Sequence, residues 1–250
     1  MAIEIPQVPL VFIEIPSIYP TNVPKEQRVK LPARLAQCTP DTKRALGQIV
    51  QALTQAGGAL YLSDMFRSYE MQFQAHNDYV TGKKKAYSPP PGGSMHESGR
   101  AFDLSLGDLG VPLRVFWDIA IPLGVFPIID RADSRLSEAW HFDCRGSHGK
   151  VYDYYLAGKA DNLPPYTAMA ASAIMAAGIM NYRVADQVIG RLQSDLIRLD
   201  CDPGPIDGIL GERTQKALAD FGVVTADLEQ ALADLEAALM KMYPGEYAEE

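Results

Sequence analysis

Apolar residues recur at intervals of three and four along several stretches of the chain, which is the spacing of an amphipathic helix. This pattern predicts helices from Asp41 to the Gly57-Gly58 pair, over Glu70–Val80 and over Leu113–Ile121. Short apolar runs without this spacing predict strands at Ala59–Leu62, Arg100–Leu106 and Trp140–Cys144. Strands and helices in mixed order indicate an α+β fold.

The two ends of the chain have different patterns. Six prolines within residues 1–35 forbid a long helix and predict an extended N-terminal arm. After a predicted linker over Gly158–Pro165, helical spacing predicts helices at Ala168–Met180, Val184–Leu199, Glu212–Phe221 and near Thr225–Met242. We therefore expect two domains, an α+β domain over residues 1–160 and a small all-α module over residues 161–250.

The formal net charge of −8 is unevenly placed along the 250 residues. Residues 1–160 carry 17 Lys and Arg against 16 Asp and Glu, whereas residues 161–250 carry 6 against 15. Since neither part is strongly basic, we expect no nucleic-acid partner. No apolar run approaches the ~20 residues that cross a bilayer, and the N-terminus lacks the basic and apolar regions of a secretory signal.

Two histidines and an aspartate carry the most specific chemical signal. His96, Asp103 and His141 supply two imidazoles and a carboxylate, a ligand set that leaves one position of a tetrahedral zinc ion open for water. Gly99 allows a sharp turn between the first two residues, so a loop residue and a strand residue can converge. The sequence therefore predicts a catalytic zinc site.

Hydrolysis at such a site also needs a base and a group that stabilises negative charge. Glu138 lies three residues before His141 and is the candidate general base and acid. Arg67 follows a predicted strand and can stabilise the oxyanion that forms on a carbonyl. Cys144 is placed on the strand face opposite His141 and is not counted as a ligand. The three cysteines form no Cys-x-x-Cys pair, so no disulfide framework is expected.

These residues resemble the signature of the VanY-type zinc D-alanyl-D-alanine carboxypeptidases, within the wider LAS group of peptidoglycan peptidases. The resemblance covers roughly residues 35–155 and rests on the pattern Ser94-x-His96-x-x-Gly99-x-Ala101-x-Asp103 followed by Glu138-x-Trp140-His141. It implies a small antiparallel sheet flanked by helices. It also implies that His96, Asp103 and His141 bind zinc and that Glu138 is the general base.

The same resemblance extends to the Arg67-Ser68 pair and to Gln72, five residues after the arginine. It implies that Arg67 polarises the scissile carbonyl and that Gln72 and Ser94 contact the terminal D-amino acid, with Ser68 also assigned to substrate binding. One departure is visible, because the family usually has Gly-Tyr before the arginine and this chain has Met65-Phe66.

The helical module resembles the type 1 peptidoglycan-binding domain over about residues 180–223. The resemblance rests on Leu192-Gln193, Asp207-Gly208, Gly211, Thr214, Ala217-Leu218 and Phe221. Leu210 replaces the usual Phe, and Glu212 replaces the usual Pro. The alternative is a helical unit that only packs on the peptidase or dimerises.

Together the two resemblances imply a zinc-dependent peptidoglycan peptidase that hydrolyses a stem-peptide bond, with D-Ala-D-Ala carboxypeptidase activity as the leading hypothesis. A phage-lysin-type endopeptidase released through a holin is the alternative enzyme, since no signal peptide is readable. A wall-binding protein that has lost turnover is the alternative outside enzymes. The bond cleaved and the oligomeric state stay open.

Overall fold

The computed structural model describes residues 5–223 and 227–248 of the chain. Its main sheet contains four short strands, which are antiparallel where they pair and lie in the order β3-β4-β6-β5. Their bounds are β3 (Leu62–Asp64), β4 (Ala101–Leu104), β5 (Val125–Pro127) and β6 (His141–Cys144). A second, two-stranded sheet pairs β1 (Val11–Phe12) with β2 (Gln37–Cys38). The α+β class is therefore confirmed.

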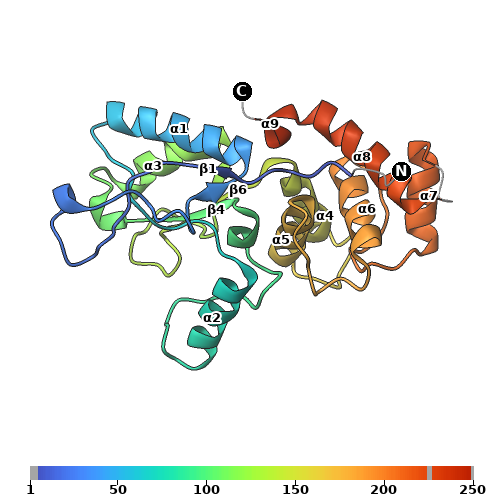
Figure 1. The fold of residues 1–250 in the computed structure, drawn as a ribbon, viewed down its shortest axis with the longest axis horizontal. Helices are drawn as coiled ribbons and strands as arrows, with labels where there is room; N and C mark the ends of the chain where they lie inside the picture. Colours follow the sequence, from blue (N-terminus) through green and yellow to red (C-terminus); the bar gives the residue numbers. More distant parts are fainter. Residues whose placement is uncertain (1–4, 224–226, 249–250) are drawn as a thin grey trace.

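Helices pack against the sheet, and further helices make up most of the second part of the chain, on the right in Figure 1. In the first part they are α1 (Pro40–Gln55), α2 (Tyr69–Val80), α3 (Leu113–Ala120) and α4 (Gly149–Leu156). In the second part they are α5 (Pro165–Ala176), α6 (Gln187–Arg198), α7 (Glu212–Phe221), α8 (Leu228–Met242) and α9 (Pro244–Tyr247). The predicted helix near Thr225–Met242 corresponds to α8, and its first two predicted residues lie outside the described residues.

Most predicted elements occur within a few residues of their expected bounds, and the exceptions have local causes. Of the strand predicted at Ala59–Leu62, only Leu62 pairs with β4, because the backbone of Ala59 and Tyr61 bonds to a neighbouring loop instead. Strand β5 and helix α4 were not predicted, since each is short and has no clear period.

The core of the first part lies between the sheet and helices α1 and α3. Phe102 and Phe142 stack at 6.0 Å between ring centroids, and Phe116 of α3 meets Phe142 edge to face at 4.7 Å. These residues and Cys144 belong to one buried apolar cluster. Because side chains alternate along a strand, Asp103 and His141 project from the opposite face. The prediction that Cys144 faces away from His141 is confirmed.

The two predicted domains contact each other through buried groups. The predicted boundary at residue 160 falls between α4 and α5, and these two helices pack on one another. Glu246, near the C-terminus, accepts hydrogen bonds from the backbone and side chain of Ser147. The N-terminal arm crosses both parts (Figure 1), and its Val8 N–H donates to the Ala176 carbonyl. Residues 1–4 of the arm lie outside the described residues, and the division into domains stays a prediction.

No helix among the described residues combines the length and the apolar character that spanning a membrane requires.

Candidate metal centre

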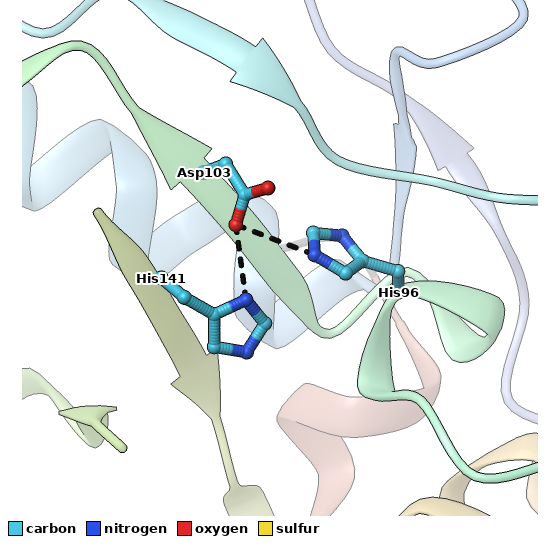
Figure 2. Close-up of side chains that lie close together, drawn as sticks. All are labelled: His96, Asp103 and His141. Atoms are coloured by element: carbon cyan, nitrogen blue, oxygen red, sulfur yellow. Dashed lines mark hydrogen bonds and ion pairs between the residues drawn. The ribbon is translucent and has the colours of Figure 1, made fainter. Parts of the chain in front are cut away.

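The three predicted ligands meet at one point of the structure (Figure 2). His96 comes from the turn before β4, Asp103 from β4 and His141 from β6, where Asp103 and His141 face each other in register. Their ligand atoms all lie within 4.8 Å of one another. Asp103 Oδ1 is 3.4 Å from His96 Nε2 and 3.0 Å from His141 Nδ1. Donor atoms around a tetrahedral zinc ion lie about 3.3 Å apart, since each bond is about 2.0 Å.

His96 is oriented as a metal ligand. Its Nδ1 lies 2.6 Å from the carbonyl oxygen of Met65 and therefore carries the proton. Its Nε2 is then the atom with a free lone pair, and this atom is buried without a hydrogen-bond partner in the described part of the chain. A buried nitrogen left unpaired beside an imidazole and a carboxylate fits a divalent cation.

Asp143 and Tyr166, which were not predicted as site residues, contact the His141 nitrogen that faces away from Asp103. This nitrogen, Nε2, lies 3.0 Å from Asp143 Oδ1 and 3.2 Å from the Tyr166 hydroxyl, which in turn donates to the same aspartate oxygen at 3.1 Å. A carboxylate on the far nitrogen of a histidine fixes the tautomer and makes the other nitrogen a better ligand. Asp143 lies two residues after His141 on the same strand. Because side chains alternate along a strand, this spacing could have predicted that Asp143 and His141 share one face. Tyr166 lies on α5, and no signal in the sequence places it there.

The electrostatics of the cluster follow from burial and opposite charge. Burial alone would raise the pKa of Asp103, but His96 and His141 hold it well below its usual range. Burial opposes the charged form of His141, yet Asp143 and Asp103 raise the pKa of this imidazole to about 10. Two buried carboxylates therefore concentrate negative charge around the histidines, which favours a cation between them.

Glu138 stands at the cavity beside the cluster. Its backbone has φ 66°, in the left-handed region that non-glycine residues rarely adopt, and the Glu138 carbonyl accepts the His141 N–H at 3.0 Å. This tight turn fixes the glutamate directly before β6. One carboxylate oxygen, Oε1, is buried with no hydrogen-bond partner in the described structure. Burial raises the pKa of Glu138, while His141 opposes the rise.

Arg67 is buried and held by its neighbours in one orientation. Asp64 accepts from its Nε at 2.7 Å and pairs with its Nη2 at 2.6 Å, and Gln72 Oε1 accepts from its Nη1 at 3.2 Å. Its backbone N–H also donates to the His96 carbonyl. A guanidinium has five N–H groups, so two remain for the cavity and for nearby Asp103. Although burial disfavours the charged form, Asp64 and Asp103 raise the pKa of Arg67.

The turn that carries His96 depends on a glycine and a capping interaction. Ser94 caps the turn Met95–Ser98 and forms a reciprocal capping box with Glu97. Gly99 ends it with φ 68°, and a Cβ there would lie 2.8 Å from Cys38 Cα. Only glycine fits, so the predicted sharp turn is confirmed.

The three residues predicted to bind substrate have different surroundings. Ser94 lines the same cavity as the metal cluster. Gln72 lies behind Arg67, where its amide nitrogen donates to Ser88 Oγ and the Pro89 carbonyl. Ser68 caps helix α2 and donates to Glu70. The cavity lining therefore includes Ser94 but neither Gln72 nor Ser68.

Met65, the departure from the family pattern, is fully buried in the sheet core. Its side chain is absent from the cavity lining, and only its carbonyl reaches the site, at His96. The Met65 side chain therefore packs in the core and does not line the cavity.

All catalytic elements predicted from the sequence line one cavity of ≈ 390 Å³. His96, Asp103, His141, Glu138 and Arg67 share it, which confirms that residues distant in the chain converge. Its other walls include Lys84, Tyr87, Arg145, Tyr152 and, from the second part of the chain, Pro164, Tyr166 and Thr167. A cluster that could hold a metal ion, a carboxylate and a guanidinium in one cavity define a candidate metallohydrolase site.

Residues 36–115 match the family model VanY, D-alanyl-D-alanine carboxypeptidase. The matched residues contain Arg67, Ser94, His96 and Asp103, while Glu138 and His141 lie beyond them. A search of curated proteins finds no match.

Three solved structures are similar to parts of the chain. One is the LdcB LD-carboxypeptidase, at 17% identity, with a TM-score of 0.41, over 55% of this chain and 68% of that chain. Another is an L,D-carboxypeptidase DacB from Streptococcus pneumoniae, at 26% identity and a TM-score of 0.36, over 48% of this chain and 72% of that chain. DacB from Streptococcus pneumoniae D39 matches at 29% identity with the same coverage and TM-score.

Proposed function

We propose that this protein is a zinc-dependent peptidoglycan peptidase that hydrolyses a stem-peptide bond as a carboxypeptidase. The observation that carries the proposal is the convergence of His96, Asp103 and His141 beside Glu138 and Arg67 in a single cavity. The VanY family match over residues 36–115 supports peptidoglycan as the substrate. D-Ala-D-Ala is the dipeptide named by that family, while the similar solved structures are described as L,D-carboxypeptidases.

In this proposal His96, Asp103 and His141 hold the metal. A bound zinc ion supplies Lewis acidity, which polarises a carbonyl and makes water more acidic. The buried His96 Nε2, which has no hydrogen-bond partner in the described residues, supports a metal ion at this position.

The remaining steps belong to side chains of the chain itself. Glu138 takes a proton from the attacking water and passes it to the nitrogen of the leaving amino acid. Its unpartnered Oε1 and its burial suit this role, because a raised pKa brings the carboxyl closer to the pH at which it must exchange protons. Arg67, held by Asp64 and Gln72, donates to the carbonyl oxygen as negative charge develops on it.

The proposal is tested by incubating the protein with zinc and purified sacculi and identifying the released fragments by mass spectrometry. Release of a single D-alanine supports the carboxypeptidase. Severed stems or cross-bridges would instead identify an endopeptidase, and unchanged muropeptides would identify a binding protein without turnover. The Glu138→Gln variant is the matched control: it should lose at least a hundredfold in rate while zinc binding remains.

We further propose that residues 180–223 bind the wall polymer. The residues of the type 1 resemblance lie on α6, on α7 and in the loop between them. The Gln193 side chain of α6 joins the three, because it accepts from the backbone N–H groups of Asp207 and Gly208 in the loop and donates to Thr214 of α7. A weak wall-binding site next to the cavity would raise the local concentration of stems. Sedimentation of the Glu138→Gln variant with sacculi tests this binding without hydrolysis.

A further inference from the structure

Arg145 is a cation at the cavity wall that the mechanism above does not use. It follows strand β6 directly, and its guanidinium carbon lies 4.9 Å from the ring centroid of Phe126 and 4.6 Å from that of Tyr152. Contacts with two aromatic rings hold a guanidinium in place, but they satisfy none of its N–H groups as ordinary hydrogen bonds do. The Arg145 guanidinium is therefore held in position, while its N–H groups can still donate hydrogen bonds to a ligand.

No acidic partner of Arg145 occurs among residues 5–223 and 227–248. Arg145 is half-buried, and the buried arginines of the described residues each have an acidic partner: Arg67 pairs with Asp64, Arg100 with Asp41 and Arg198 with Glu246. Arg145 has only its backbone N–H bonded, to the Gly124 carbonyl, and its Nε is buried without a partner in the part of the chain described. A fixed, unpaired guanidinium at a cavity is a receptor for a carboxylate, which it can bind through two N–H groups at once.

The strand order places this receptor across the metal cluster from Arg67. The Arg67 guanidinium lies 3.5 Å from Asp103 of β4, whereas Phe126, which contacts the Arg145 guanidinium, belongs to β5 at the edge of the sheet. His141 lies on β6, between these two strands. Two strand spacings correspond to roughly 10 Å, the length of about three residues of extended peptide. An extended substrate can therefore reach Arg145 on one side of the cluster while its scissile carbonyl meets Arg67.

We propose that Arg145 binds a carboxylate on the part of the stem peptide that precedes the scissile bond, and that it makes the enzyme select acidic stems. This inference rests on the proposed function. Two carboxylates of a stem peptide have the required chemistry. One is the second carboxylate of diaminopimelate, which is absent when lysine takes its place, and the other is the α-carboxylate of a γ-linked D-glutamate, which is absent when that group is amidated.

The test compares kcat/KM for three synthetic pentapeptide stems: one with D-glutamate and diaminopimelate, one with lysine in place of diaminopimelate, and one with the glutamate α-carboxylate amidated. The protein as it exists should lose about tenfold on the peptide that lacks the recognised carboxylate, as expected for one charge-assisted hydrogen-bonded pair. The peptide affected identifies which of the two carboxylates Arg145 binds.

Arg145→Gln should hydrolyse all three peptides equally well, at the rate of the poorest substrate, and Arg145→Lys should keep part of the preference because it keeps the charge but not the planar fork. Arg114→Gln on α3, whose arginine is exposed and outside the cavity lining, is the charge-matched control and should keep the full preference. Thermal unfolding of each variant checks that it folds.

Equal hydrolysis of the three peptides by the unmodified protein, or an unchanged preference in Arg145→Gln, would overturn the inference. Calorimetric binding of the same peptides separates it from the proposed function. If no peptide is hydrolysed but the acidic one binds about tenfold more tightly through Arg145, the carboxylate site is correct and the proposed hydrolysis is wrong. Equal binding of all three by a protein without turnover would refute both.

Discussion

Replacing Asp143 by asparagine should weaken zinc binding without touching a zinc ligand. Asp143 is fully buried and accepts at one oxygen, Oδ1, from both His141 Nε2 and the Tyr166 hydroxyl. An asparagine can keep this acceptor, but it removes the negative charge behind His141. It also places an NH₂ group at the position of Oδ2, which has no hydrogen-bond partner in the described residues. Two new donors would then be buried unpaired.

The magnitude follows from the charge that is lost. A hydrogen bond to a charged group contributes about 1.5–3 kcal/mol and a neutral one about 0.5–1.5 kcal/mol, so the change costs about 1–1.5 kcal/mol, or roughly a 5- to 13-fold weaker Kd. This range meets the lower end of the roughly 10- to 100-fold effect of residues that orient a metal-binding histidine. Tyr166→Phe removes only a neutral hydroxyl and should cost about 0.5–1.5 kcal/mol, or roughly 2- to 10-fold. Because both groups meet the same nitrogen, their effects should not add.

The assay is competition for zinc with a chromophoric chelator near neutral pH, on the unmodified protein, both single variants and the double variant. Asp118→Asn on the exposed face of α3 makes the same chemical change away from the site and should leave the Kd unchanged. A zinc Kd within twofold of the unmodified value in Asp143→Asn would refute the positioning role of Asp143. If that variant fails to unfold cooperatively, Tyr166→Phe alone carries the test.

Three further predictions concern stability. Gly99→Ala should lower the free energy of unfolding by at least about 2 kcal/mol, measured by urea denaturation, because the new Cβ meets backbone at 2.8 Å and φ is 68°; a change under ~0.5 kcal/mol would contradict this. Glu246→Ala should cost about 3 kcal/mol because buried Arg100 and Arg198 each lose one carboxylate partner and keep only Asp41 and Asp195, whereas exposed Glu14→Ala should leave the unfolding midpoint nearly unchanged. Burial, Arg198 and Arg100 hold the pKa of His148 well below 6.5, so the unfolded chain takes up a proton first as pH falls. The stability that neutral His148 contributes above pH ~6.5 is therefore lost as the pH falls below that value, by up to about 1.4 kcal/mol per pH unit. Between pH 7 and 5, the urea midpoint of His148→Gln should fall less steeply than that of the unmodified protein.

Sequence periodicity predicted helix α1 well because this helix buries one continuous face. In α1, Leu46, Ile49 and Leu53 are fully buried, and the Gly57-Gly58 pair ends the helix as expected. Helix α7 has the predicted bounds, Glu212–Phe221. Short elements gave weaker signals, because strands of three or four residues such as β5 are defined by the neighbours with which they pair.

The metal cluster could be predicted because each ligand lies in a local motif with a fixed offset. His96 and Asp103 are joined by a turn that Gly99 makes possible, and Glu138 is tied to His141 by a tight turn of its own. Local geometry alone therefore predicts most residues of the candidate site. The partners that orient these groups were harder to predict, because they come from other elements.

Tyr166 and Arg145 illustrate what the sequence leaves open. Tyr166 reaches Asp143 only because α5 packs against the turn that carries His96. Arg145 is distinguished by its place at the cavity and by the rings of Phe126 and Tyr152 that contact its guanidinium, with no carboxylate partner among the described residues. By itself the sequence predicted the candidate ligands, the candidate base and the long helices, since these depend on side chains a few positions apart. Only the tertiary structure decided how these side chains are oriented and which cation at the cavity has no carboxylate partner among the described residues, because those contacts join segments whose approach is set by the packing of the whole core.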